Sequence, residues 1–75
     1  MDEAVACQVG AGLRGARLRA GLTQAQVAEA AGLPPEAYMR MERGRLLPSI
    51  PTLVALCRAL SISAEWLRQV PAPGH

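Results

Sequence analysis

The sequence predicts a small all-α domain with five helices. No segment keeps the strict alternation of apolar and polar residues that is typical of a strand. Apolar residues instead recur at steps of three and four, which is the spacing of one helix face. Glycine, proline and serine separate these periodic segments, at Gly21, Gly32, Gly44, Pro48 and 61–63. At 75 residues, the chain has the length of one domain.

The first helix is expected over residues 5–20. Gly21 follows it and suits the left-handed conformation that commonly ends a helix. The apolar residues that would form its buried face are spaced by four, four, three and four: Val5, Val9, Leu13, Ala16 and Ala20. This spacing indicates an amphipathic helix with one side packed against a core.

A second helix is expected over residues 24–31, because Thr23 and Gln26 form a capping box in front of it. The Thr23 hydroxyl can accept a hydrogen bond from the backbone N–H of Gln26. The side-chain oxygen of Gln26 can in turn accept from the backbone N–H of Thr23. Gly32 then offers a left-handed exit from the helix.

The third helix is predicted to begin at 34–36, since proline suits a first turn whose amide has no partner. It would end at 42–43, just before Gly44. Ser49 would cap a fourth helix, whose apolar face comprises Leu53, Leu56, Cys57 and Leu60. Ser63 would cap a short fifth helix, whose apolar residues are Trp66, Leu67 and Val70. We expect Trp66 to pack this last helix on the core.

The composition excludes most catalytic and metal-binding chemistry. The single histidine is His75, and no Cys-x-x-Cys pair or Cys/His cluster occurs. A catalytic triad or a zinc site therefore has no residues from which it could be built, and we expect a non-enzyme without metal or cofactor. Cys7 and Cys57 are expected to be buried or half-buried apolar side chains in a reducing cytoplasm. No stretch approaches the ~20 apolar residues of a membrane helix, so the expected location is cytoplasmic.

Residues 24–41 have the spacing of two helices joined by a tight turn. Ala28 is a small residue at the position where the two helices would cross, and Gly32 tolerates the positive φ that the turn needs. Apolar residues occupy the positions that would fill the shared core: Val27, Ala31, Leu33, Tyr38 and Met41. The pattern predicts a helix-turn-helix, which presents its second helix to the DNA major groove.

The segments on either side of this pattern make the prediction more specific. Gly21–Gln24 precedes it, Glu42–Gly44 with a following proline comes after it, and Trp66–Leu67 closes the series. In this order, the motifs resemble the Cro and phage-repressor helix-turn-helix family, also called the xenobiotic-response-element type, over about residues 9–68. The resemblance implies a five-helix, lambda-repressor-like DNA-binding domain at 9–70. An N-terminal extension at 1–8, which can include the start of the first helix, would precede it, and a disordered tail at 71–75 would follow.

The resemblance also assigns structural and backbone-binding roles. Arg17 and Glu42 match a partly buried ion pair that ties the third helix to the first. The residues expected to contact the DNA sugar-phosphate backbone are Gln24, Arg43, Arg45, Arg14 and Arg19. Positive charge is concentrated in this part of the chain, since positions 14–45 contain six arginines and only three glutamates. Arginine contacts of this kind are insensitive to sequence and depend strongly on salt.

The matching base-reading positions are Pro35, Glu36, Met39 and Arg40. Arg40 can bind guanine with two hydrogen bonds, and Glu36 can accept one from a cytosine amino group. Met39 can contact a thymine methyl, whereas the Pro35 side chain has no hydrogen-bonding group. Proline and glutamate depart from the polar donors that are common at the start of this helix in the family.

A homodimer on an inverted-repeat operator is the expected assembly. The apolar residues expected to stay exposed in a monomer and to form the interface are Leu46, Leu47, Ile50, Trp66, Leu67 and Val70. Two alternatives stay open. The first is a protein-interaction module on the same fold, antitoxin-like or a regulatory subunit, which the low donor content of the third helix favours. The second is a DNA-coating protein without sequence preference, which the formal charge of only +2 disfavours.

Overall fold

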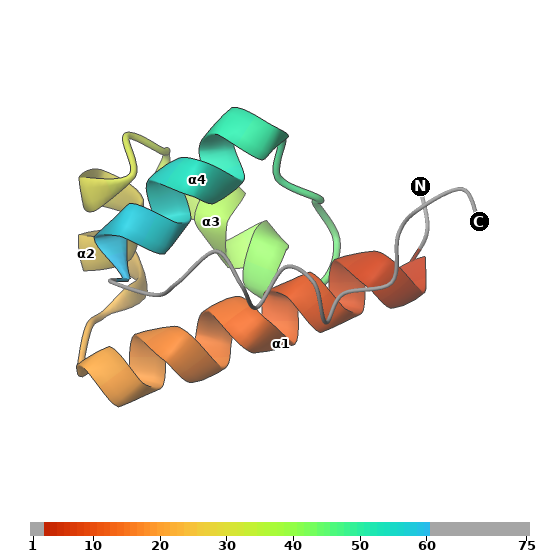
Figure 1. Ribbon diagram of the computed structural model, residues 1–75, viewed down its shortest axis with the longest axis horizontal. Helices are drawn as coiled ribbons and strands as arrows, with labels where there is room; N and C mark the ends of the chain where they lie inside the picture. Colours follow the sequence, from red (N-terminus) through yellow and green to blue (C-terminus); the bar gives the residue numbers. More distant parts are fainter. Residues whose placement is uncertain (1–2, 61–75) are drawn as a thin grey trace.

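The structure is a computed structural model that describes residues 3–60 (Figure 1). Within this range the chain forms helices and no strand, so the all-α prediction is confirmed. The helices, in chain order, are α1 (Glu3–Ala20), α2 (Gln24–Ala30), α3 (Pro35–Glu42) and α4 (Ile50–Ala59). The predicted fifth helix, the predicted tail and the side chains of Trp66, Leu67 and Val70 lie outside the described residues.

The longest helix, α1, runs along one side of the molecule, and α2, α3 and α4 pack together against one face of it (Figure 1). It begins at Glu3, two positions before the predicted start, so residues 3–8 are helical. Its inner face carries four of the five apolar residues that the spacing predicted, since Val5, Val9, Leu13 and Ala16 are buried. The prediction for Ala20 is wrong: it is the last residue of the helix and is exposed. No helix in the described part of the chain is long and apolar enough to cross a membrane.

The turn between α2 and α3 has the predicted construction. Both hydrogen bonds of the capping box at Thr23 and Gln26 are present, at 3.1 and 2.8 Å. Gly32 has a φ of 72°, a backbone conformation that residues with a side chain rarely adopt. Ala28 is 0% exposed where the helices cross, so a larger side chain there would push them apart. These features confirm the helix-turn-helix geometry.

One core joins all the described helices. The predicted shared residues Val27, Tyr38 and Met41 are buried in it, and Ala31 and Leu33 pack against its edge. The apolar face predicted for α4 is also buried: Leu53, Leu56, Cys57 and Leu60. Ser49 caps α4, since its hydroxyl accepts a hydrogen bond from the Thr52 N–H at 3.3 Å. The expected core is therefore confirmed over the described residues.

The sequence reasoning missed a close approach of α1 to α3. A Cβ atom added to Gly10 would lie 2.3 Å from the carbonyl oxygen of Met41 and 2.7 Å from that of Glu42. Only a glycine fits there, because both obstacles are backbone atoms. A glycine inside a helix costs stability on its own account, and this conflict with helix propensity was the signal that could have revealed the crossing.

The prediction that Cys7 is at least half-buried is wrong, because its side chain is exposed whereas Cys57 is buried. Cys7 follows Val5 and Ala6, which face the core, so the helical rotation carries it to the outer edge of α1. Its thiol lies against the loop after α3, where a Cβ atom on Gly44 would come within 2.8 Å of the sulfur.

Candidate nucleic-acid interface

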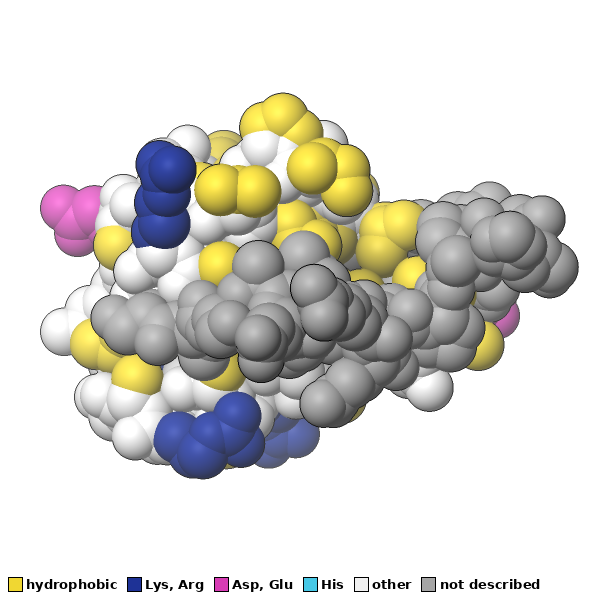
Figure 2. Space-filling view, in the orientation of Figure 1, with side chains coloured by type: hydrophobic (Ala, Val, Ile, Leu, Met, Phe, Trp, Pro, Cys, Tyr) yellow, Lys and Arg dark blue, Asp and Glu magenta, His cyan; other side chains and the backbone are white. Residues whose placement is uncertain are grey.

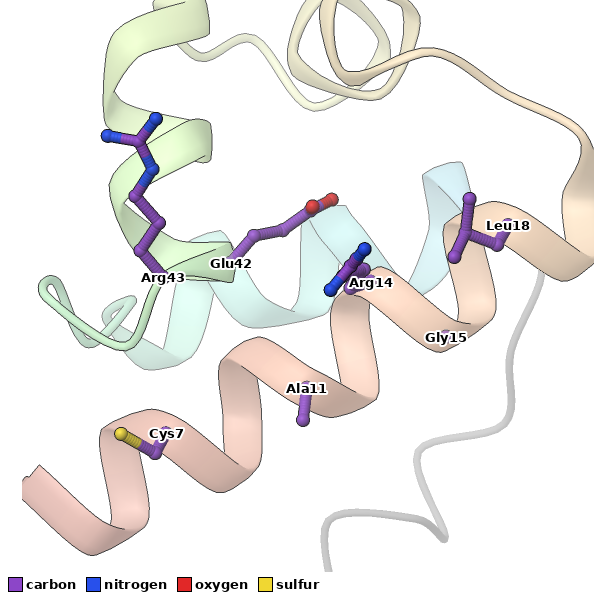
Figure 3. A pocket seen from close by; sticks show the side chains of 7 residues that line it. All are labelled: Cys7, Ala11, Arg14, Gly15, Leu18, Glu42 and Arg43. Carbon is purple, nitrogen blue, oxygen red and sulfur yellow. The ribbon is translucent and has the colours of Figure 1, made fainter.

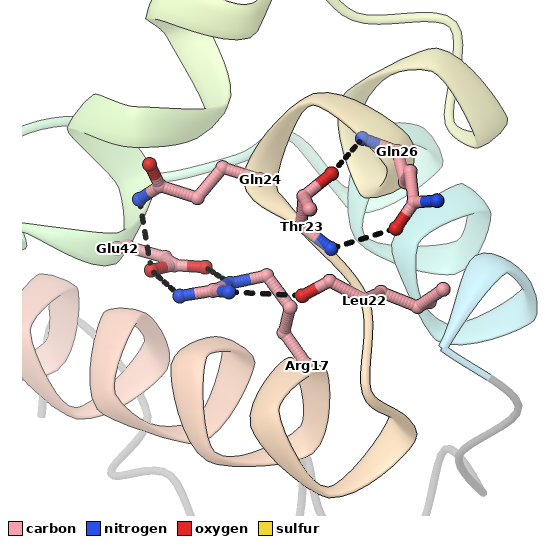
Figure 4. Close-up of polar contacts among 6 residues, drawn as sticks. All are labelled: Arg17, Leu22, Thr23, Gln24, Gln26 and Glu42. Atoms are coloured by element: carbon pink, nitrogen blue, oxygen red, sulfur yellow. Dashed lines mark hydrogen bonds and ion pairs between the residues drawn. The ribbon is translucent and has the colours of Figure 1, made fainter.

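Arg17 of α1 and Glu42 of α3 form the ion pair that the sequence suggested (Figure 4). The Arg17 Nε and Nη2 groups donate to the two carboxylate oxygens of Glu42, at 2.6 and 3.2 Å. Arg17 Nη1 donates at 3.0 Å to the carbonyl oxygen of Leu22, in the loop before α2. One guanidinium group therefore ties together α1, the start of the helix-turn-helix and the end of α3.

Gln24, the first residue of α2, completes this network. Its side-chain Nε2 donates to Glu42 Oε1 at 3.1 Å (Figure 4), and the side chain is half-buried. The Glu42 carboxylate thus accepts hydrogen bonds from two elements besides its own helix. The sequence reasoning placed Gln24 on DNA and did not foresee this internal bond, since the spacing of 18 residues carries no local signal.

The charges in the network stabilise each other. Burial by itself would raise the pKa of Glu42, but the hydrogen bonds from Arg17, the nearby Tyr38 hydroxyl and the hydrogen bond from Gln24 outweigh it and hold this pKa below its ordinary value of 4.5. The hydrogen bond to Glu42 likewise raises the pKa of Arg17. Both groups are consequently charged at neutral pH, and the pair is nearly neutral as a unit.

Tyr38 lies behind this pair, fully buried on the inner face of α3. Its hydroxyl makes no hydrogen bond of good geometry among the described residues, but it lies close enough to the Glu42 carboxylate for each group to shift the pKa of the other. Burial raises the pKa of Tyr38 well above its ordinary value, and the negative charge of Glu42 raises it further. The residue therefore stays neutral and acts as a packing group that fixes the position of α3.

The outer face of α3 carries the predicted base-reading residues. Pro35, Glu36 and Arg40 are exposed, and Met39 is half-buried. Three of these residues and one neighbour line a shallow hollow of about 270 Å³: Glu36, Met39, Arg40 and Arg43. Because α3 is held from behind by Tyr38, this face presents a carboxylate, a thioether and two guanidinium groups from a well-supported helix.

Of the predicted backbone-contacting arginines, Arg43 lines this hollow and Arg14 shares another hollow with Arg43, whereas Arg45 lines a separate one with Glu3 and Cys7. All of them are exposed, and none has an ion-pair partner in the described range: Arg14, Arg19, Arg43 and Arg45. Arg14 comes from α1, while Arg43 and Arg45 flank Gly44 at the end of α3. An exposed guanidinium without an internal carboxylate is available for an external anion. The described residues thus combine a rigid reading helix with free cationic groups beside it.

Apolar side chains gather on a different face, over α4 (Figure 2). Ile50 is 71% exposed and Val54 41% exposed, although both are large hydrophobic residues. Leu46 and Leu47, the other predicted interface residues within the described range, are half-buried and pack against the core. The exposed patch therefore extends along α4 to Val54, which the sequence reasoning did not include.

The family profile described as a helix-turn-helix domain matches residues 8–69. The crystal structure of the clp gene regulator ClgR from Corynebacterium glutamicum is 34% identical in sequence, with a TM-score of 0.82, over 88% of this chain and 71% of that one. A second structure of the same regulator is 33% identical, with a TM-score of 0.80, over 84% of this chain and 81% of that one. No curated protein sequence matches the chain.

A more distant likeness is limited to the fold. The restriction-modification controller protein C.Esp1396I is 22% identical, with a TM-score of 0.79, over 87% of this chain and 86% of that one. These similar proteins are regulators and a controller protein, not enzymes. The resemblance seen in the sequence is thereby confirmed. Since the helix-turn-helix profile matches most of its length and a regulator is 33% identical over 84% of it, this chain belongs to the helix-turn-helix domain family.

Proposed function

We propose that this protein is a sequence-specific transcriptional regulator that binds double-stranded DNA and reads the major groove with α3. One observation carries the proposal: α3 is fixed on its inner face by Tyr38 and Glu42, while its outer face is exposed and free of ion pairs within the described residues. A reading element needs such rigid support, because a loosely held side chain discriminates poorly between bases. The likeness to a clp gene regulator supports the same conclusion.

In this proposal the outer face of α3 contacts base edges. Arg40 donates two hydrogen bonds to guanine O6 and N7, and Glu36 accepts one from a cytosine amino group. Met39 contacts a thymine methyl, and Pro35 excludes water at the start of the helix. Glu36 and Arg40 lie one helical turn apart, so they read base pairs that are close together.

Gln24, Arg43, Arg45, Arg14 and Arg19 contact the sugar-phosphate backbone. These contacts fix the register of α3 in the groove but carry no sequence information. The guanidinium groups of the four arginines support this assignment, because each can bind a phosphate without first breaking an ion pair to another described residue.

The regulator acts as a homodimer and a repressor. Among the described residues, the proposed dimer interface is the exposed patch of Ile50 and Val54 on α4, together with Leu46 and Leu47. A two-fold dimer would place two reading helices about 34 Å apart and so require an inverted repeat. A dimer that covers such a site blocks access of other proteins to the promoter.

Selection from a randomised pool of duplex DNA, at about 150 mM salt, tests the proposal. The expected result is enrichment of an inverted repeat with half-sites about ten base pairs apart. Retention without enrichment would indicate a DNA-coating protein. If a folded sample retained no DNA at all, the proposal would be overturned in favour of a protein-interaction module. The scarcity of donors at Pro35, Glu36 and Met39 favours that module as the second candidate.

A further inference from the structure

Arg14 and Arg43 line the same hollow although they are far apart in the sequence. Arg14 comes from α1 and Arg43 from the end of α3, on either side of Glu42 (Figure 3). The hollow has a volume of about 400 Å³, and the other residues that line it are Arg17, Gln24 and Glu42. Three helices therefore contribute to one polar depression at the edge of the reading face.

The charge in this hollow favours a single anion. Arg17 and Gln24 satisfy the Glu42 carboxylate, whose side chain is only 4% exposed. Its negative charge is thus neutralised within the floor of the hollow. Arg14 and Arg43 lack an ion-pair partner among the described residues and leave two positive charges at the rim. A phosphodiester group suits this charge pattern, because its oxygens can accept hydrogen bonds from two guanidinium groups once their flexible side chains turn toward it.

A second hollow adjoins the first and shares its arginines. It has a volume of about 410 Å³ and a largely apolar floor that includes Ala11, Gly15 and Leu18 (Figure 3). Arg14 and Arg43 thus separate a polar depression, toward Gln24, from an apolar one along α1. An anion is directed to the polar side, where the Arg17–Glu42 pair adds no net charge and Arg14 and Arg43 supply the positive charge.

We propose that one backbone phosphate of the bound DNA is held in the polar hollow by Arg14 and Arg43 together. The inference rests on the proposed function and deepens it, since it assigns two separate backbone contacts to one phosphate. Gln24 is then a positioning residue at this site, because its amide donates to Glu42 and keeps that carboxylate turned toward Arg17. The clamp couples α1 to the end of α3 and so sets the angle at which α3 enters the groove.

The test uses the full chain and an enriched duplex from the selection above, with a neutral methylphosphonate placed at each backbone position in turn. For the unmodified duplex, Arg14→Ala and Arg43→Ala should each weaken binding about tenfold and reduce the salt slope by about one. With the wild-type chain, one methylphosphonate position per half-site should cause a similar loss. At that same position, both variants should lose little more. Arg58→Ala is the control, because Arg58 is exposed on α4, away from the hollow.

The outcomes separate this inference from the function on which it rests. The wild-type chain can bind DNA while each variant becomes insensitive to methylphosphonate at a different backbone position. In that case the two arginines contact different phosphates and the clamp is overturned. It is also overturned if both variants behave like Arg58→Ala. If the wild-type chain retains no duplex, the proposed function fails and the clamp fails with it. Circular dichroism of each variant shows whether a loss of binding comes from unfolding.

Discussion

The two faces of α3 differ in how tightly they are constrained. On its inner side α3 meets α1 so closely that only a glycine fits at position 10. On its outer side Glu36 and Arg40 are exposed and have no ion-pair partner among the described residues. The inner face is constrained by backbone contact, by a buried tyrosine and by the Arg17–Glu42 pair. The outer face has none of these constraints. Changes on the inner face should therefore affect folding, and changes on the outer face should affect binding alone.

Gly10→Ala should break the inner contact with the largest effect. The new Cβ atom would overlap two backbone carbonyl oxygens, so α1 and α3 must separate. We expect a loss of at least about 4 kcal/mol in the free energy of unfolding, measured in urea, which approaches the whole stability of a domain this small.

Gly15→Ala is the matched control, because the nearest atom to its added Cβ is the flexible end of Arg19, at 3.3 Å. This variant should gain about 0.5–1 kcal/mol from helix propensity. Equal stability of the two variants would contradict the close crossing of α1 and α3.

Glu42→Gln should have the next largest effect, because it leaves the Arg17 charge partly buried without a carboxylate. We expect a loss of about 3 kcal/mol at pH 7. The folded state lowers the pKa of Glu42, so its contribution is present above the ordinary value of 4.5 and is lost as the pH falls through the folded pKa. Wild type and variant should therefore converge in acid. Glu29→Gln, at an exposed position of α2, should change stability by no more than about 0.5 kcal/mol. A gap that stayed constant down to strongly acidic pH would count against this role of the pair.

Arg40→Ala sharpens the comparison from the outer face. It should leave the free energy of unfolding unchanged within about 0.5 kcal/mol. It should weaken binding to the selected duplex by about 1–3 kcal/mol and relax the preference at one base pair, as measured by titration against single-position variants of the duplex. Arg58→Ala should do neither. Loss of stability in Arg40→Ala would show that the two faces of α3 are not independent.

Glu36→Gln should alter specificity more than affinity. Glutamate only accepts hydrogen bonds and suits a cytosine amino group, whereas glutamine both donates and accepts and suits adenine. Repeating the selection with the variant should therefore move the preference at one position of each half-site from cytosine toward adenine. An unchanged selected sequence would remove Glu36 from the reading surface.

Tyr38→Phe should have the smallest effect, although the residue is fully buried. The hydroxyl makes no hydrogen bond of good geometry among the described residues, so its removal should cost little, and phenylalanine keeps the ring in place. We expect the free energy of unfolding, measured in urea, to stay the same or to rise by up to about 1 kcal/mol. A clear loss of stability would mean that the hydroxyl stabilises Glu42.

The local features of the fold were predictable because they depend on neighbouring residues. The capping box at Thr23 and the positive φ of Gly32 follow from side-chain chemistry within a few positions. The roles of Gly10 and Gln24 were not predictable in this way. Gly10 is needed because α1 approaches the backbone of α3, and Gln24 donates a hydrogen bond to Glu42. Both contacts join segments that are distant in the sequence, where local patterns carry no information.

Helical spacing and capping act over one or two turns, so the all-α class, the helix-turn-helix and most of the apolar helix faces could be predicted from the residues alone. The sequence also singled out Arg17, Glu42 and the arginines around α3, through the order of motifs along the chain. Other properties became visible only in three dimensions: Cys7 is exposed, Tyr38 is buried behind Glu42, and Arg14 and Arg43 border one hollow. They depend on the angle and distance at which packed helices meet, and those follow from the whole core rather than from any one segment.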